Sequence, residues 1–190
     1  MTMTTLEDLL VEQIRDLYDA EKQLVRALPK MAGAANSDEL QRALQSHLEE
    51  TNNQVSRLER MFDELDVPAK GKTCKGMRGL VEEGGEALDE NSEIPLTDLA
   101  IIAAAQRVEH YEISAYGTAR AIAQQLGQQT IVSLLEETED EEKAADSKLT
   151  EIALGLLGEA TSAEETEDEE IQPARKSTQP VKGSRRAARG

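Results

Sequence analysis

Residues 5–32, TLEDLLVEQIRDLYDAEKQLVRALPKMA, decide the fold because their apolar side chains recur with the period of an α-helix. At about 100° per residue, one stripe of this helix contains Leu6, Leu10, Ile14, Leu17, Leu24, Leu28 and Met31. Glu21 falls near the middle of that stripe, where an unpaired carboxylate would be unfavourable to bury. The segment therefore predicts a helix that carries an acidic side chain on its buried face.

The composition is that of a water-soluble helical protein. The chain has 190 residues, of which 38% are hydrophobic and 31% charged, enough for one domain with a substantial core and a tail. Only 2% are aromatic, and β-branched residues do not alternate with polar ones, so strands are not expected. A net charge of −17 disfavours binding of the domain to nucleic acid or to acidic membranes.

Signals for export or membrane insertion are not found in the sequence. The first residues lack a basic region, and no apolar run approaches the roughly 20 residues that span a bilayer. We therefore expect a cytoplasmic protein without a membrane partner. Cys74 is the single cysteine, so an internal disulfide is ruled out.

Helical periodicity and end signals divide the chain into four long helices and one short helix. The first long helix is predicted to begin at Thr4 or Thr5 and to end at about residue 32. The other long helices are predicted at 38–65, 97–127 and 129–157, and the short one at 77–88 within a crossover. Thr4-x-x-Glu7 is typical of a capping box, Thr97 of a cap, and Gly127 and Gly158 of helix ends. The sequence thus predicts an all-α, antiparallel four-helix bundle over residues 1–158, with a short extra helix in the crossover.

The composition changes after Gly158. The stretch that follows is first acidic and then basic and turn-rich, without apolar residues to bury, so residues 159–190 are expected to be disordered. A solubilising or weakly interacting tail is favoured over one that binds nucleic acid, because the basic end lacks aromatic residues.

The third long helix also has acidic residues on its apolar side. Glu109 and Glu112 fall inside the apolar arc of 97–127, whereas His110 falls on the polar side and is expected at the surface or beside a ligand rather than as a ligand itself. These two carboxylates repeat the pattern of Glu21.

The second and fourth long helices show the same anomaly. His47 lies in the apolar stripe with Glu50 at its edge, three residues on, so both can reach one ion. In the fourth helix Glu142 is central and Glu141 lies at the edge, with Asp146 close by. Carboxylates that share a site repel one another unless a cation compensates them, so a metal site is favoured over protonated or salt-bridged carboxylates.

Five strings resemble the YciE/YciF family of ferritin-like bacterial stress proteins, and the resemblance covers about residues 5–157. They are DLYDAEKQL (16–24), SHLEETNNQVSRLE (46–59), CKGMRGLVEEG (74–84), QRVEHYEISAYG (106–117) and DEEKAADSKLTEIA (140–153). The resemblance implies a ferritin-like four-helix bundle that is usually dimeric, with a carboxylate-bridged di-iron-type site.

Some residues of this sequence depart from the ferritin-like ligand pattern, in which two helices supply one Glu and two supply Glu-x-x-His. Glu21 fits the first-helix role, and Glu112 with Glu109 fits the third-helix role in a way similar to rubrerythrin. The second-helix pair is reversed, and Thr138 stands where a second histidine would be needed. An oxygen-rich site of this kind favours iron or manganese.

The expected function is that of a di-metal protein in oxidative or osmotic stress. Two iron or manganese ions would be held by residues drawn from Glu21, His47, Glu50, Glu109, Glu112, Glu141 and Glu142. The alternative is a non-catalytic dimeric helical protein whose metal site is structural or vestigial. A homodimer is expected because residues 97–127 are apolar over more of the helix circumference than one bundle core needs, although the short helix could cover part of it.

Overall fold

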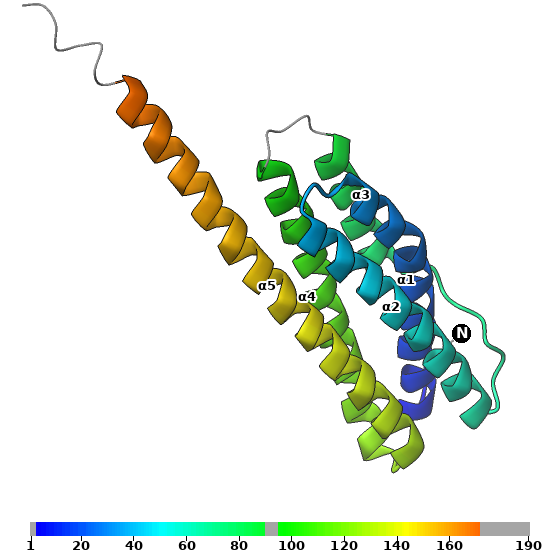
Figure 1. The fold of residues 1–190 in the computed structure, drawn as a ribbon. Coiled ribbons are helices and arrows are strands. Elements are labelled where there is room, and N and C mark those ends of the chain that lie inside the picture. Colours follow the sequence, from blue (N-terminus) through cyan, green and yellow to red (C-terminus); the bar gives the residue numbers. More distant parts are fainter. Residues whose placement is uncertain (1–2, 90–94, 172–190) are drawn as a thin grey trace, which may run out of the picture.

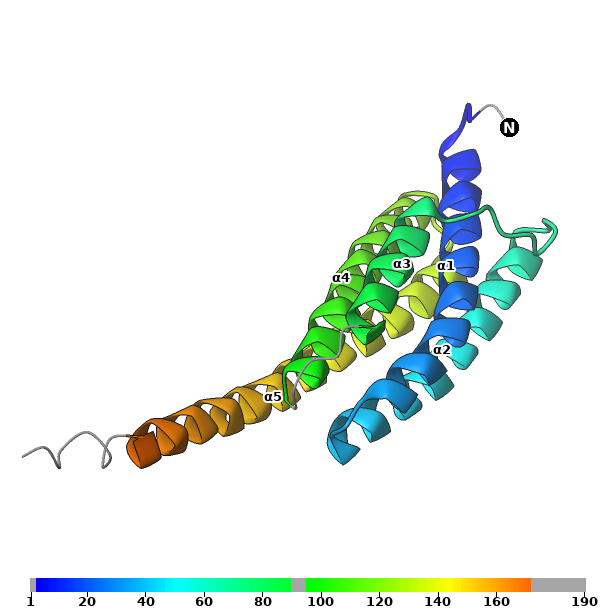
Figure 2. The ribbon, with the colours of Figure 1, turned by 90° about the horizontal axis from the view of Figure 1, so that it is seen from above.

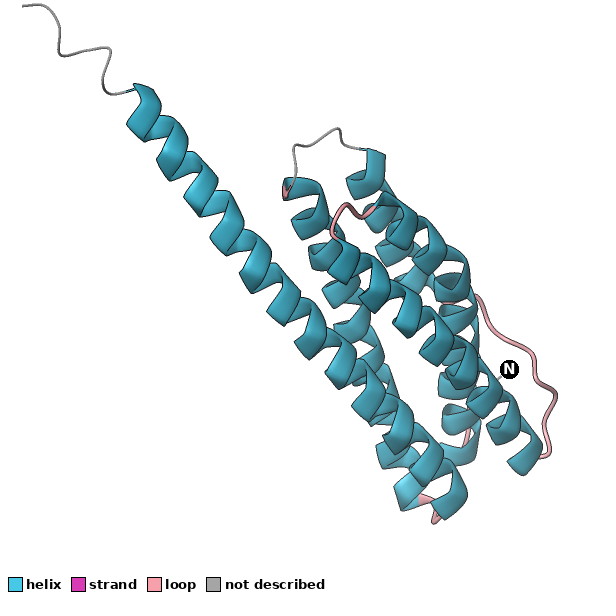
Figure 3. Cartoon of the chain, in the orientation of Figure 1, coloured by secondary structure: helices cyan, strands magenta, loops and turns pink. Residues whose placement is uncertain are grey.

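The computed structural model describes residues 3–89 and 95–171, which form helices joined by loops (Figure 3). The five helices are α1 (Leu6–Ala34), α2 (Asp38–Glu64), α3 (Lys75–Asp89), α4 (Leu96–Gln125) and α5 (Gln129–Ile171). Within the described ranges there is no β-strand, which confirms the predicted all-α class. In that same part of the chain, no helix is both long and apolar enough to cross a membrane.

The four long helices pack as two antiparallel pairs. α1 pairs with α2 and α4 pairs with α5, each across a short turn. Contacts of α1 with α4 and of α2 with α5 hold the two pairs together (Figures 1 and 2). α3 lies against α1 and α4, so it covers part of the broad apolar surface of α4.

The helix starts agree with the sequence to within one or two residues. Ser37 caps α2 as predicted, and its hydroxyl accepts a hydrogen bond from the backbone N–H of Leu40. The predicted caps of α1 and α4 are wrong. Thr5 rather than Thr4 caps α1, because it closes the capping box with Asp8, and α4 begins directly after Pro95, which leaves Thr97 inside its first turn.

The predicted end of α5 at Gly158 is wrong. Gly127 has a φ of 71° and ends α4, as predicted, but Gly158 has no positive φ and α5 continues to Ile171. Alanine and glutamate predominate after Gly158 and have high helix propensity. Residues 159–171 are therefore helical rather than disordered, and the remainder of the predicted tail, 172–190, lies outside the described residues.

Buried polar side chains divide the interior into two hydrophobic clusters. One cluster includes Leu24, Leu28, Leu40, Leu44, Ile101, Val108, Leu149 and Ile152. The other includes Leu10, Ile14, Leu17, Leu58, Phe62, Tyr116, Ile131 and Leu135. Between them along the helices lies a polar layer formed by Glu21, His47, Thr51, Gln54, Glu109, Glu112, Thr138 and Glu142. Each of the four long helices thus contributes to both clusters and to the polar layer.

Asp98, at the start of α4, forms hydrogen bonds with the turn between α1 and α2. Its carboxylate is 1% exposed. It accepts hydrogen bonds from the backbone N–H groups of Asn36 at 2.7 Å and Ser37 at 2.8 Å. One buried side chain therefore ties the two helix pairs together at this end.

We expect Asp98→Ala to lower the free energy of unfolding by about 2 kcal/mol, because two backbone donors lose a charged acceptor. Urea unfolding followed by circular dichroism measures the change. Asp38→Ala is the matched control, since Asp38 is exposed in the first turn of α2 and its loss should lower stability by no more than about 1 kcal/mol. Equal losses in the two variants would contradict the role given to Asp98.

Candidate metal centre

The polar layer brings four carboxylates and one imidazole into the interior from four different helices. Glu21 comes from α1, His47 from α2, Glu109 and Glu112 from α4, and Glu142 from α5. Their exposed fractions are 1%, 6%, 1%, 0% and 0% in that order. Glu109 and Glu112 share a face of α4 because residues three apart lie on the same side of a helix.

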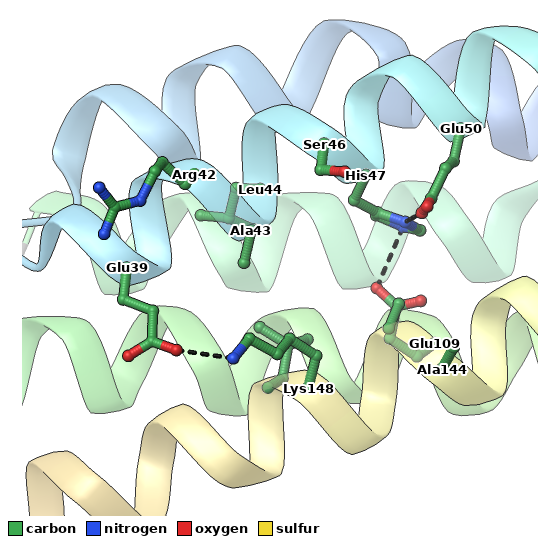
Figure 4. Close-up of a pocket in the computed structure, with 12 residues that line it drawn as sticks. Glu39, Arg42, Ala43, Leu44, Ser46, His47, Glu50, Glu109, Ala144 and Lys148 are labelled. Carbon is green, nitrogen blue, oxygen red and sulfur yellow. Dashed lines mark hydrogen bonds and ion pairs between the residues drawn. The ribbon is translucent and has the colours of Figure 1, made fainter.

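Four of these side chains form a compact group. One ligand atom from each of His47, Glu109, Glu112 and Glu142 lies within 4.8 Å of the others. Nε2 of His47 is 3.3 Å from Oε1 of Glu109 and 3.7 Å from Oε2 of Glu142. The dashed line between His47 and Glu109 in Figure 4 marks the first of these contacts. Three carboxylates and one imidazole at this spacing are a ligand set suited to iron or manganese.

Several buried polar atoms of the centre have no hydrogen-bond partner. They are both carboxylate oxygens of Glu112 and Oε2 of Glu21, Glu109 and Glu142, together with Nε2 of His47, which has only its ion-pair contacts with Glu109 and Glu142. Each such atom costs about 1–3 kcal/mol to leave unsatisfied, and more when it is charged. A bound cation would satisfy them together, so the residues present fit a metal ion.

Neighbouring side chains hold the candidate ligands in place. The Tyr116 hydroxyl donates to Oε1 of Glu21, and both groups are buried. Nε2 of Gln54 donates to Oε1 of Glu142 at 2.5 Å and to Oε2 of Glu141 at 3.0 Å. Such outer hydrogen bonds fix the orientation of a ligand and restrict the geometry that a metal meets.

The electrostatics of the centre favour protonated carboxylates when no cation is bound. Burial raises the pKa of Glu21 to about 7, although the hydrogen bond from Tyr116 opposes the rise. Burial also raises the pKa of Glu112 well above 4.5, and the nearby charges of Glu21 and Glu142 add to it. The pKa of Glu142 is raised by burial too. A metal ion would therefore displace protons from these groups when it binds.

His47 is held in the charged form by its surroundings. Burial lowers its pKa, but the carboxylates of Glu109, Glu50 and Glu142 outweigh burial and raise the pKa well above 6.5. Its Nδ1 lies 3.4 Å from Oε2 of Glu50, which leaves Nε2 facing the centre. An imidazolium among carboxylates must lose its proton before it can bind a metal.

The structure separates the candidate ligands predicted from the sequence into three groups. His47, Glu109, Glu112 and Glu142 come together, and Glu21 lies beside them. Glu50 is at the edge, with 43% of its side chain exposed. Glu141 points toward Arg57, with their charged atoms 2.5 and 2.7 Å apart, so its negative charge is already compensated.

His110, predicted at the surface, is indeed exposed, and its Nε2 lies 3.5 Å from Asp146. Sequence reasoning missed the roles of Tyr116 and Arg57. Tyr116 has the spacing of an ordinary core residue, and only its hydroxyl contact distinguishes it. Arg57 lies three residues after Gln54 on α2, a spacing that could have indicated a polar path to the buried centre.

The chain is similar to proteins of one bacterial family. The family model described as a domain of unknown function, DUF892, matches residues 5–168. Protein YciF of Escherichia coli (strain K12) is 44% identical over 155 residues, which are 81% of this chain and 93% of YciF.

Solved structures give the same result. The crystal structure of the E. coli stress protein YciF matches with a TM-score of 0.80 and 43% identity, over 82% of this chain and 99% of that chain. YcfI of Rhodopseudomonas palustris, described as a candidate structural protein, matches with a TM-score of 0.75 and 45% identity, over 77% and 94%. A protein from Xanthomonas campestris pv. campestris, 20% identical with a TM-score of 0.66 over 85% and 99%, shares the fold. This chain therefore belongs to the DUF892 family, the family of the E. coli stress protein YciF.

Proposed function

We propose that this protein is a ferritin-like four-helix-bundle protein that binds iron or manganese in its polar layer and acts in the response to oxidative or osmotic stress. The observation that carries the proposal is the group of buried carboxylate oxygens and one imidazole nitrogen that converge without hydrogen-bond partners. The stress role is supported by its relative YciF, which is called a stress protein.

In this proposal His47, Glu109, Glu112 and Glu142 hold the first ion. A second ion would use Glu21, whose side chain interacts with Glu112, so that Glu112 is shared. Iron or manganese bound there would supply one-electron chemistry with oxygen or peroxide. The protein supplies the buried ligand set and, through Tyr116 and Gln54, the orientation of its carboxylates.

A structural role for the metal is the second candidate. Thr138 stands where a second histidine would be needed, and its hydroxyl donates to the backbone carbonyl of Leu134 at 3.3 Å and accepts from Nη1 of Arg57 at 3.3 Å. The relative YcfI is described as a candidate structural protein.

Under either function we also propose a homodimer, because Ile113 and Ile122 on α4 remain only partly buried in the single chain.

We expect anaerobic titration with ferrous iron, or titration with Mn²⁺, to saturate at about two ions per chain. In Glu142→Gln the metal affinity should fall at least tenfold. Isothermal calorimetry and metal analysis after gel filtration measure both quantities. Glu141→Gln is the matched control: it changes the neighbouring residue on α5, whose charge Arg57 already compensates, so binding should stay within about threefold of the unsubstituted protein.

The assignment of the centre fails if Glu142→Gln binds metal as tightly as the unsubstituted protein. Saturation at one ion would leave His47, Glu109, Glu112 and Glu142 as the site and remove the second ion at Glu21. Peroxide consumption by the loaded protein then separates the two candidate functions, since a structural ion raises the melting temperature without turnover.

A further inference from the structure

A pocket between α2 and α5 leads from the surface to the candidate metal centre. Its volume is about 530 Å³, and its inner end is formed by His47 and Glu109. This volume is many times the ~30 Å³ share of one water molecule and falls within the range of small-molecule sites. Oxygen or peroxide alone would leave most of it empty, so the pocket has room for an organic molecule.

The two ends of the pocket differ in charge. Arg42 and Lys148 line the outer end together with Glu39 (Figure 4). Nζ of Lys148 lies 2.6 Å from the Glu39 carboxylate and 3.6 Å from that of Glu151, so Lys148 is already paired with carboxylates. Among the described residues no salt bridge includes Arg42. Its positive charge acts on the carboxylate of Glu39, which Lys148 also contacts. Arg42 therefore gives the outer end one guanidinium outside the printed salt bridges, in a protein whose net charge is −17.

The middle and the inner end set the orientation of a ligand. Between the charged ends the wall is aliphatic, formed by Ala43, Leu44, Ala144, Ala145 and Leu149. The carboxylates of Glu50 and Glu109 outnumber the single imidazole of His47, so the inner end is acidic and would repel an anion. Arg42 and His47 are five residues apart on α2, or about 7.5 Å along the helix axis. An anionic head at Arg42 would therefore leave an apolar chain along the aliphatic wall, directed toward His47.

We propose that this pocket binds a medium-chain aliphatic monocarboxylate, with its carboxylate at Arg42 and its hydrocarbon chain between α2 and α5. This proposal rests on the proposed function in one respect only: if the centre binds a metal, the molecule in the pocket is a candidate substrate of that centre. The binding contacts themselves involve side chains of the pocket wall, and they exist without a metal.

The test is calorimetric titration with butanoate, hexanoate and octanoate, on metal-free and on manganese-loaded protein. Each added methylene should tighten binding about threefold to fourfold while it becomes buried. Arg42→Glu should weaken octanoate binding at least tenfold, and octylammonium should bind at least tenfold more weakly than octanoate. Arg26→Glu is the matched control, because Arg26 is an exposed arginine of α1 outside this pocket, and it should leave binding unchanged.

A second variant, Ala144→Phe, fills the pocket from an exposed position on α5, so it should remove octanoate binding without unfolding the protein. Absence of octanoate binding in both forms, with normal manganese uptake, overturns this inference alone. Octanoate binding that needs manganese and ignores Arg42→Glu also overturns it, since the carboxylate would then sit on the metal. Failure of manganese to bind, with octanoate binding intact, overturns the proposed metal function and leaves this inference standing.

Discussion

Metal-free protein should become more stable when the pH is lowered from 8 to 6, whereas metal-loaded protein should become less stable. The carboxylates of the polar layer have raised pKa values in the metal-free fold, about 7 for Glu21 and well above 4.5 for Glu112 and Glu142. In the loaded protein, protons compete with the metal for the same oxygens, so acidification weakens binding and the stability that binding adds.

The sign follows from proton uptake. Between the unfolded value of 4.5 and the folded value of about 7, native Glu21 keeps a proton that the unfolded chain has lost. The free energy of unfolding therefore falls as pH rises through this window and is constant above it. Glu112 and Glu142 extend the window to higher pH, and the raised pKa of His47 acts in the same direction. Glu21 alone contributes about 1 kcal/mol between pH 8 and pH 6.

Differential scanning calorimetry at pH 6, 7 and 8 measures this effect on chelated and on manganese-loaded protein. A change of 1 kcal/mol corresponds to about 2–4 °C in melting temperature for a chain of this size, and the other three groups add to it. Parallel trends in the two forms would mean that these carboxylates do not share one buried site.

Phe62→Ala should lower the free energy of unfolding by about 3–5 kcal/mol. The Phe62 ring is 0% exposed in the second hydrophobic cluster and forms a T-shaped pair with the Tyr18 ring at a centroid distance of 5.5 Å. Removal of the ring leaves a cavity that helices fixed by packing on both sides cannot close. Urea unfolding followed by circular dichroism measures the change.

The control is Leu154→Ala, since Leu154 on α5 is 66% exposed and its truncation should change stability by less than about 0.5 kcal/mol. A loss below about 1.5 kcal/mol for Phe62→Ala would mean that the cluster relaxes around the missing ring. Manganese affinity should stay unchanged in Phe62→Ala, because the ring belongs to the hydrophobic cluster and not to the polar layer.

Periodicity predicted the helices well because their buried faces are formed by regularly spaced apolar residues. Ser37 and Gly127 gave correct boundaries, since a side-chain cap and a positive φ are local properties. Gly158 did not, because a glycine ends a helix only where the chain adopts the left-handed conformation. The packing of the two helix pairs through Asp98 depends on residues more than 60 positions apart and could not be predicted from local pattern.

The candidate site was predictable to the level of a helix face but not of a single side chain. Glu21 and Glu112 stood out because each interrupts an apolar stripe, and both are buried. Spacing placed Glu142 at the centre of the stripe and Glu141 at its edge, but it did not decide which of them is the ligand, since neighbours on a helix differ by only about 100°. The distinction depends on Arg57 of another helix, which pairs with Glu141 and Glu137 but not with Glu142.

The position of the polar layer has a consequence for the cooperativity of unfolding. Each long helix passes through two hydrophobic clusters that are separated by buried polar groups, several of which lack a hydrogen-bond partner in the metal-free state. In the metal-free protein the two clusters can therefore unfold as partly independent units. An ion bound by residues of α2, α4 and α5 would link these helices between the clusters, so that both clusters unfold together. Amide hydrogen exchange in metal-free protein should therefore show two protection classes, one for each cluster, and these should merge into a single global opening when the centre is loaded.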